Sequence, residues 1–267
     1  MRIQKVSAGR GAAWVNESIG LLKSGGKEVW VPALLVGVLS SLPYLGTVLG
    51  LIMILFYAGL VLCFDKPDGG HTVFSGFSDG GFGRLLPLIA LNIGLAALAM
   101  LVLWPSMQPV LEAAMNDQTP GKAETLVMVE ALSKHLPWLI PVGIFVSWIT
   151  QFAVPLASLK RFSGTEAIPL ALRAIGANIP ALIINFLCLM VIVIVVGIVL
   201  MIPITLVNTL FAGSPMLAGL LSLPLTAALS AVIIALMCGN MLYAYREVFD
   251  EPGTGADSGS VNSELLL

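Results

Sequence analysis

The chain has 267 residues, of which 58% are hydrophobic and 10% are charged. Soluble domains contain roughly 45–50% apolar and about 25% charged residues, so this composition excludes an ordinary soluble protein and indicates that lipid is the solvent. The net charge of −2 says little by itself, because in a membrane protein the placement of Lys and Arg matters more than their sum.

The N-terminal segment contains an amphipathic helix near residues 12–24. On a helical wheel its apolar side chains share one arc, opposite Glu17 and Lys23. The arc consists of Trp14, Val15, Ile19, Leu21 and Leu22. We expect this helix to lie on the membrane surface and to end at Gly25 and Gly26. The segment lacks the apolar core of a signal peptide, so the first span is expected to direct the chain to the membrane.

Residues 29–64 form a run without a single charged side chain. A straight helix of this length would extend about 54 Å, well beyond a hydrocarbon core of about 30 Å, so the run must reverse. Pro43 cannot continue a preceding helix and Gly46 follows it, so the reversal is expected between residues 40 and 46. The resulting spans are residues 29–41, which is short for a crossing, and residues 44–64.

Four further apolar segments complete a predicted set of six transmembrane helices. They are residues 85–107, 137–158, 180–207 and 216–245. Two segments, 72–82 and 166–177, repeat the amphipathic pattern of the N-terminal helix. Residues 108–136 form the longest hydrophilic connection, which we interpret as an amphipathic hairpin. The sequence thus predicts an all-α integral membrane protein with amphipathic surface helices.

Three regions are expected: a cytoplasmic N-terminal segment (1–28), a membrane domain (29–249) and a disordered, Gly/Ser-rich cytoplasmic tail (250–267). With six spans, eleven of the 13 Lys and Arg residues fall on the side of both termini. The positive-inside rule makes that side cytoplasmic. The order of surface helix, span and span then occurs three times, which suggests three parallel repeats.

The opening VSAGRGAAWVNESIGLLK, the LPYLG turn and the closing YAYREVF resemble a family of uncharacterised proteobacterial inner-membrane proteins. The similarity covers residues 5–249 and implies a multi-span protein of the bacterial inner membrane. It brings no catalytic residues with it. The alternation of surface helix and paired spans is also distantly similar to the membrane domain that precedes some glycerophosphodiester phosphodiesterase domains. The catalytic domain is not part of this sequence, so that similarity implies an architecture and no activity.

Residues with the chemistry of a catalytic or metal site are scattered. His71 and His135 have no partner at metal-ligand spacing, and Cys63, Cys188 and Cys238 fall in apolar segments without CxxC spacing. Nucleophile, zinc-protease and phosphate-loop motifs do not occur. We therefore assign no catalytic, cofactor or metal residues and expect a protein that is not an enzyme.

The apolar spans contain no Asp, Glu, Lys or Arg, which weighs against a pump or a proton-coupled carrier. Six polar side chains remain in them. They are Asn92, Ser147, Thr150, Gln151, Asn185 and Asn240. Hydrogen bonds between helices are the expected role of these side chains. The alternative is a polar path for a substrate.

Small residues recur at intervals of four in three spans, where they let helix backbones approach closely. The rows are Ala33, Gly37 and Ser41, then Gly46 and Gly50, and Ala227, Ala231, Ala235 and Gly239. Packing within one chain is the favoured use of these rows, ahead of a dimer interface.

Two functional hypotheses follow. The first is a non-catalytic scaffold or accessory factor of the inner membrane whose surface helices lie along the lipid headgroups. The second is a carrier or channel for an apolar or amphipathic solute, because Pro141, Pro155, Pro203 and Pro224 are expected to interrupt membrane helices. The lipid bilayer is the expected partner, a homo-oligomer or another membrane protein stays open, and neither a nucleic acid nor a cofactor is expected.

Overall fold

The computed structural model describes residues 2–42, 45–78, 80–115 and 122–249. Within these residues every regular element is helical. The elements are α1 (Arg10–Ser24), α2 (Lys27–Ser41), α3 (Leu45–Asp65), the 3-10 helix η1 (Val73–Phe77), α4 (Gly81–Met115), α5 (Lys122–Leu159), α6 (Gly164–Leu210) and α7 (Pro215–Val248). The predicted tail lies outside the described residues.

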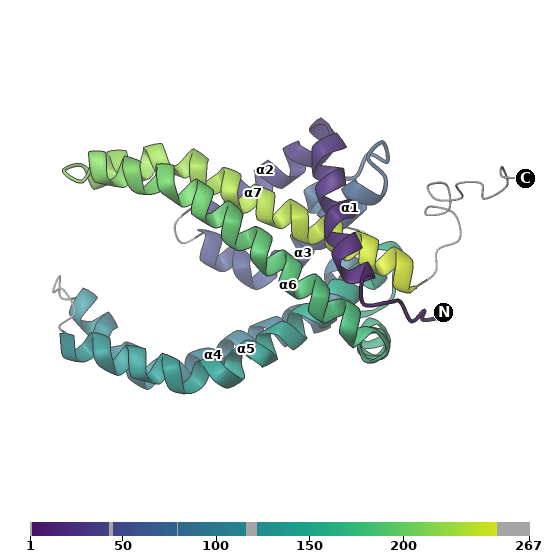
Figure 1. Cartoon of the computed structure of the whole chain (residues 1–267), viewed down its shortest axis with the longest axis horizontal. Coiled ribbons are helices and arrows are strands. Elements are labelled where there is room, and N and C mark those ends of the chain that lie inside the picture. The colour runs from purple at the N-terminus through teal and green to yellow at the C-terminus, as the bar shows by residue number, and fades with distance from the viewer. Residues whose placement is uncertain (1, 43–44, 79, 116–121, 250–267) are drawn as a thin grey trace, which may run out of the picture.

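Three helical hairpins, α2–α3, α4–α5 and α6–α7, build the molecule (Figure 1). Near the two ends of the described chain, residues 2 and 249, α1 packs across α6 and α7. We call this part of the molecule the terminal end. From there the α4–α5 and α6–α7 hairpins diverge, and the described ends of their helices lie apart at the opposite end (Figure 1). The shorter α2–α3 hairpin packs along α7.

Among the described residues, four helices are long and apolar enough to cross a membrane, which agrees with the predicted membrane-protein class. They are Gly81–Gln108, Val129–Leu159, Gly164–Leu210 and Met216–Val248. The first predicted hairpin is shorter. Its second helix contributes only Leu49–Asp65 as an apolar helix, and the 15 residues of α2 extend about 22 Å against a core of about 30 Å. Neither six spans nor a threefold repeat is confirmed.

Two predicted chain breaks are confirmed. The first reversal falls where it was expected, since α2 ends at Ser41 and α3 begins at Leu45. In α6 the backbone leaves helical geometry at Asn178, with φ −128° and ψ 21°. Pro180 explains this break, because proline removes an amide donor and crowds the preceding turn. The kink separates the predicted segment 166–177 from the long apolar part of α6.

The amphipathic hairpin predicted within residues 108–136 does not form an element of its own in the residues that the structure describes. α4 continues to Met115 and α5 already begins at Lys122, so both neighbouring helices extend through this region. Leu126 and Val129, which the wheel placed on an apolar face, are 67% and 53% exposed. Amphipathic periodicity predicts a helix but does not show whether it is separate from the span that follows.

The segment 72–82 also differs from its prediction. Only Val73–Phe77 is helical before α4 begins, and it is a 3-10 turn packed against α3. Val73 is buried, whereas the rings of Phe74, Phe77 and Phe82 are exposed. A Cβ on Gly59 would collide with the carbonyl of Val73. Glycine is therefore needed where η1 lies on α3.

α1 is present as predicted and ends before Gly25, but its apolar arc has a different neighbour. Trp14 and Val15 are buried within the protein, in contact with other helices. A Cβ on Gly11 would collide with the carbonyl of Ala181 on α6. The centre of the arc thus packs on protein and not on lipid, because a helical wheel identifies an apolar face without identifying what covers it.

The small-residue rows of the first and last spans pack against each other, as predicted for contacts within one chain. A Cβ on Gly37 of α2 would come within 2.9 Å of the Ala231 amide nitrogen on α7. Ala33, Ala231 and Ala235 are all fully buried. Gly50 differs, because a Cβ there would meet no atom within 4 Å.

Candidate functional site

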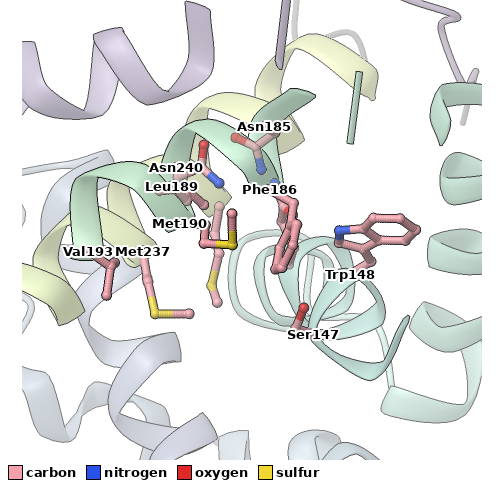
Figure 2. Close-up of a pocket in the computed structure, with 11 residues that line it drawn as sticks. Ser147, Trp148, Asn185, Phe186, Leu189, Met190, Val193, Met237 and Asn240 are labelled. Carbon is pink, nitrogen blue, oxygen red and sulfur yellow. The ribbon is translucent and has the colours of Figure 1, made fainter. Parts of the chain in front are cut away.

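A cavity of about 260 Å³ lies where α5, α6 and α7 converge (Figure 2). Each helix presents side chains spaced three or four residues apart, which places them on one face. The lining residues are Ser147, Trp148 and Gln151 from α5, Asn185, Phe186, Leu189, Met190 and Val193 from α6, and Met237, Asn240 and Met241 from α7. The cavity is therefore an apolar, methionine-rich chamber with a few polar groups.

Three side-chain amides in this chamber are buried and incompletely hydrogen-bonded. Gln151 is 5% exposed, Asn185 is 1% exposed and Asn240 is 2% exposed. Among the described residues, the Gln151 Nε2, the Asn185 Oδ1 and the Asn240 Oδ1 have no hydrogen-bond partner. An unpaired buried polar atom costs about 1–3 kcal/mol, so a partner that supplied the missing bonds would be favoured.

The other polar side chains of the spans have partners on their own helices. The Asn92 amide donates to the Leu88 carbonyl at 3.0 Å, and the Thr150 hydroxyl donates to the Val146 carbonyl at 3.0 Å. Ser147 likewise donates to Ile144. The expected bonds between helices are wrong for these three side chains. The structure thus separates the six polar residues into a self-satisfied set and an unsatisfied set in the cavity.

The cavity is graded along the helix axes. Asn240 lies six residues before Arg246 on α7, and Asn185 lies seven residues after the kink at Asn178, so along the helix axes these amides are about 9 Å from Arg246 and about 10.5 Å from the kink. Val193 continues the α6 wall away from that end. The three amides therefore lie toward the terminal end of the cavity, whereas Val193 and Met237 lie toward the middle of the helices.

No ionisable side chain lines the cavity. Charged groups instead pair at the terminal end, where Arg246 lies 2.7 Å from the Asp65 carboxylate and the Arg10 Nε lies 2.6 Å from the Glu247 carboxylate. The hydrogen bond to Glu247 raises the pKa of Arg10 above its usual value. Glu247 also accepts a 2.6 Å hydrogen bond from the Trp14 indole, which fastens α1 to α7.

Other residues singled out in the sequence lie outside the cavity. The three cysteines are free thiols, and His135 accepts a 3.2 Å hydrogen bond from the Trp138 indole. Over the described ranges no group of three or more His, Cys, Asp or Glu is placed to hold a metal ion. The four prolines expected to interrupt helices lie inside α5, α6 and α7, and the helices continue past them. The backbone of α6 leaves helical geometry at Asn178 instead.

The walls of the cavity were missed by the sequence analysis. Its polar members were named, but Trp148, Phe186 and the three methionines were not. The available signal was the spacing of Met237 and Met241 on either side of Asn240, which places them near one another on α7. That spacing does not show which other helices face these residues of α7.

Comparisons with protein-family models, with curated proteins and with solved structures find no match to this chain. The function is therefore inferred from the geometry of the cavity.

Proposed function

We propose that this chain is a non-catalytic integral membrane protein that binds an amphipathic, membrane-dissolved solute between α5, α6 and α7. The observation that carries the proposal is the apolar cavity with three unsatisfied buried amides. Ligand sites combine mainly hydrophobic walls with a few convergent polar groups, and this cavity has that composition. The proposal corresponds to the solute-binding alternative of the sequence analysis.

The depth of the amides supports a ligand that enters from the membrane. The ion pairs of Arg246 and Arg10 mark the terminal end as the polar boundary. Amides about 9–11 Å inside that boundary would lie just below the headgroups. An amphipathic molecule of the adjacent leaflet would meet them with its polar end while its chain followed the apolar wall toward the bilayer centre.

The scaffold hypothesis loses part of its basis, because the centre of the α1 arc contacts protein. Its remaining support is the exposure of three phenylalanine rings, Phe74, Phe77 and Phe82. Such rings suit the membrane interface. They would serve equally well to anchor a solute-binding protein, so they do not favour a scaffold.

We place the protein in the bacterial inner membrane with both termini in the cytoplasm. Residues 2 and 249, the ends of the described chain, and the 160–163 connection lie at the same end of the molecule (Figure 1), which suits the charge bias of the sequence. We further infer that four long helices cross while the α2–α3 hairpin extends only part of the way. The end of α2 supports this inference. The Ser41 hydroxyl lies 3.5 Å from that of Ser230, which is fifteen residues into α7 and so near the middle of that helix.

Single cysteines, introduced after the three native ones are replaced, test this topology. A cysteine at Gly213, in the exposed α6–α7 turn, should react with a membrane-impermeant thiol reagent added outside intact cells. A cysteine at Ser41 should not react. Labelling of the cysteine at position 41 from outside would show that the first hairpin crosses the membrane completely. Protection of the cysteine at position 213 would contradict the proposed orientation.

Native mass spectrometry of the purified protein tests solute binding. The wild type should retain one small amphipathic molecule per chain, and Val193→Trp should lose it because the indole fills the cavity. Val191→Trp is the matched control, since Val191 is 57% exposed on the same helix and lies outside the cavity. Equal retention by both variants would refute binding at this site.

A further inference from the structure

We propose that the cavity selects a neutral lipid with a free hydroxyl headgroup, such as a long-chain alcohol or a glyceride with an unesterified hydroxyl. This inference rests on the proposed function and specifies its ligand. It follows from the hydrogen-bonding capacity, the charge and the size of the site.

The unsatisfied atoms include both kinds of hydrogen-bonding group. The Gln151 Nε2 is a donor, whereas the Asn185 Oδ1 and the Asn240 Oδ1 are acceptors. A ligand hydroxyl can accept from the first and donate to one of the others, so a single group supplies both functions. An ester or ether oxygen accepts only, and it would leave both asparagine oxygens without a donor.

The match to a hydroxyl does not depend on how each amide is turned. Exchanging the oxygen and nitrogen of an Asn or Gln side chain exchanges an acceptor for a donor. A hydroxyl pairs with either arrangement because it performs both roles. A hydroxyl headgroup therefore suits the site whichever way the three amides are turned.

The charge of the site excludes phosphate and carboxylate headgroups. The cavity has no Lys, Arg or His among its lining residues, so a buried anion would lack a counter-charge. Desolvating an unpaired ion is far more costly than desolvating a hydroxyl. The cavity should consequently bind ordinary anionic lipids more weakly than neutral hydroxyl-bearing lipids.

The size of the site favours a single chain. A volume of about 260 Å³ lies just below the range of about 300–1,000 Å³ that is usual for small-molecule sites. It accommodates a small headgroup and the first part of one chain. The rest can leave past Met190, which is 42% exposed at the rim, and continue in the bilayer.

The test is photo-crosslinking of three matched probes to the full-length protein in nanodiscs. The probes are octadecanol, octadecyl methyl ether and octadecanoate, each with the same diazirine in the chain. We expect octadecanol to crosslink to α5–α7 peptides about tenfold more than the other two, the ratio that corresponds to about 1.4 kcal/mol. Equal labelling by alcohol and ether would overturn the hydroxyl class while leaving solute binding intact.

Variants assign the selectivity to the amides. Gln151→Leu and Asn240→Leu should each reduce alcohol crosslinking about fivefold or more, because each removes a hydrogen bond to the ligand. Asn92→Leu is the control, since that amide bonds to its own helix outside this cavity. Unchanged crosslinking in both cavity variants would also overturn the hydroxyl class.

A measurement of thermal stability separates a loss of binding from a loss of folding. The thermal midpoint of Gln151→Leu should match or exceed that of the wild type, because the replaced nitrogen is unpaired. Reduced crosslinking is therefore attributable to binding and not to unfolding. If no probe labels peptides of the cavity and Val193→Trp changes nothing, the proposed function itself fails.

Discussion

The terminal end and the far end of this molecule are held together by different means. At the terminal end, Trp14, Tyr245 and Phe249 are almost completely buried, and ion pairs join helices distant in sequence. At the far end of the α6–α7 hairpin, Leu210 is 69% exposed and Met216 is 89% exposed. The protein supplies its own packing at one end and leaves it to lipid at the other.

This difference reflects the physics of helices in a bilayer. Lipid tails are as apolar as leucine, so exposed apolar faces carry no penalty there and helices associate through close packing and polar contacts. Glycines at positions 11, 37 and 59 permit such close packing in this chain. The hairpins can therefore diverge in lipid once their shared end is fixed.

Overpacking the terminal end should have the largest effect. In Gly11→Leu the new side chain would collide with the backbone of α6 at Ala181, and rigid contacts of this kind cost at least about 1–3 kcal/mol. We expect loss of the monodisperse folded peak in size-exclusion chromatography. Gly20→Leu is the matched control on α1, because a Cβ there meets no atom within 4 Å. A folded Gly11→Leu protein would mean that α1 does not sit on α6.

Shortening equivalent apolar side chains at the two ends should sharpen the comparison. Leu182→Ala removes a fully buried side chain and should lower the free energy of unfolding by about 2–5 kcal/mol. Ile198→Ala changes a side chain that is 60% exposed on the same helix, and it should have a much smaller effect. Denaturation in mixed micelles measures both. Equal losses would indicate that the far end is also packed by protein.

The carboxylate of Glu247 should contribute less than the apolar core. Glu247→Leu leaves the buried Trp14 indole without its acceptor, which should cost about 1–3 kcal/mol. Glu247→Gln keeps a neutral acceptor and should recover part of that loss. The same denaturation assay decides the order, and a Gln variant less stable than the Leu variant would contradict it.

The smallest effect is expected where the N-terminal segment before α1 meets the kink in α6. The Asn178 side chain accepts from the Val6 amide at 2.8 Å and donates to the Gln4 carbonyl at 3.0 Å. Asn178→Ala should therefore speed hydrogen exchange at Val6 about tenfold, with little change at the buried α7 amides. Unchanged exchange at Val6 would show that this segment is held by other contacts.

Features set by local chemistry were predictable from the sequence. The reversal after Ser41, the break before Pro180 and the contact at Gly37 follow from proline, glycine and small-residue rules. The burial of Trp14 was not predictable, because it depends on where α6 and α7 cross α1. The polar members of the cavity were visible as an unusual set, but only the arrangement of three helices shows that Gln151, Asn185 and Asn240 share one chamber.

Lipid capture from two positions tests the central claim that the cavity holds a selected ligand. A photoreactive amino acid would replace Met237 in the cavity wall or Met201, which is 55% exposed on α6 and outside this cavity. After irradiation in native membranes, mass spectrometry identifies the attached lipids. We predict one predominant neutral, hydroxyl-bearing species at position 237 and the bulk lipid mixture at position 201. The same mixture at both positions would contradict the account.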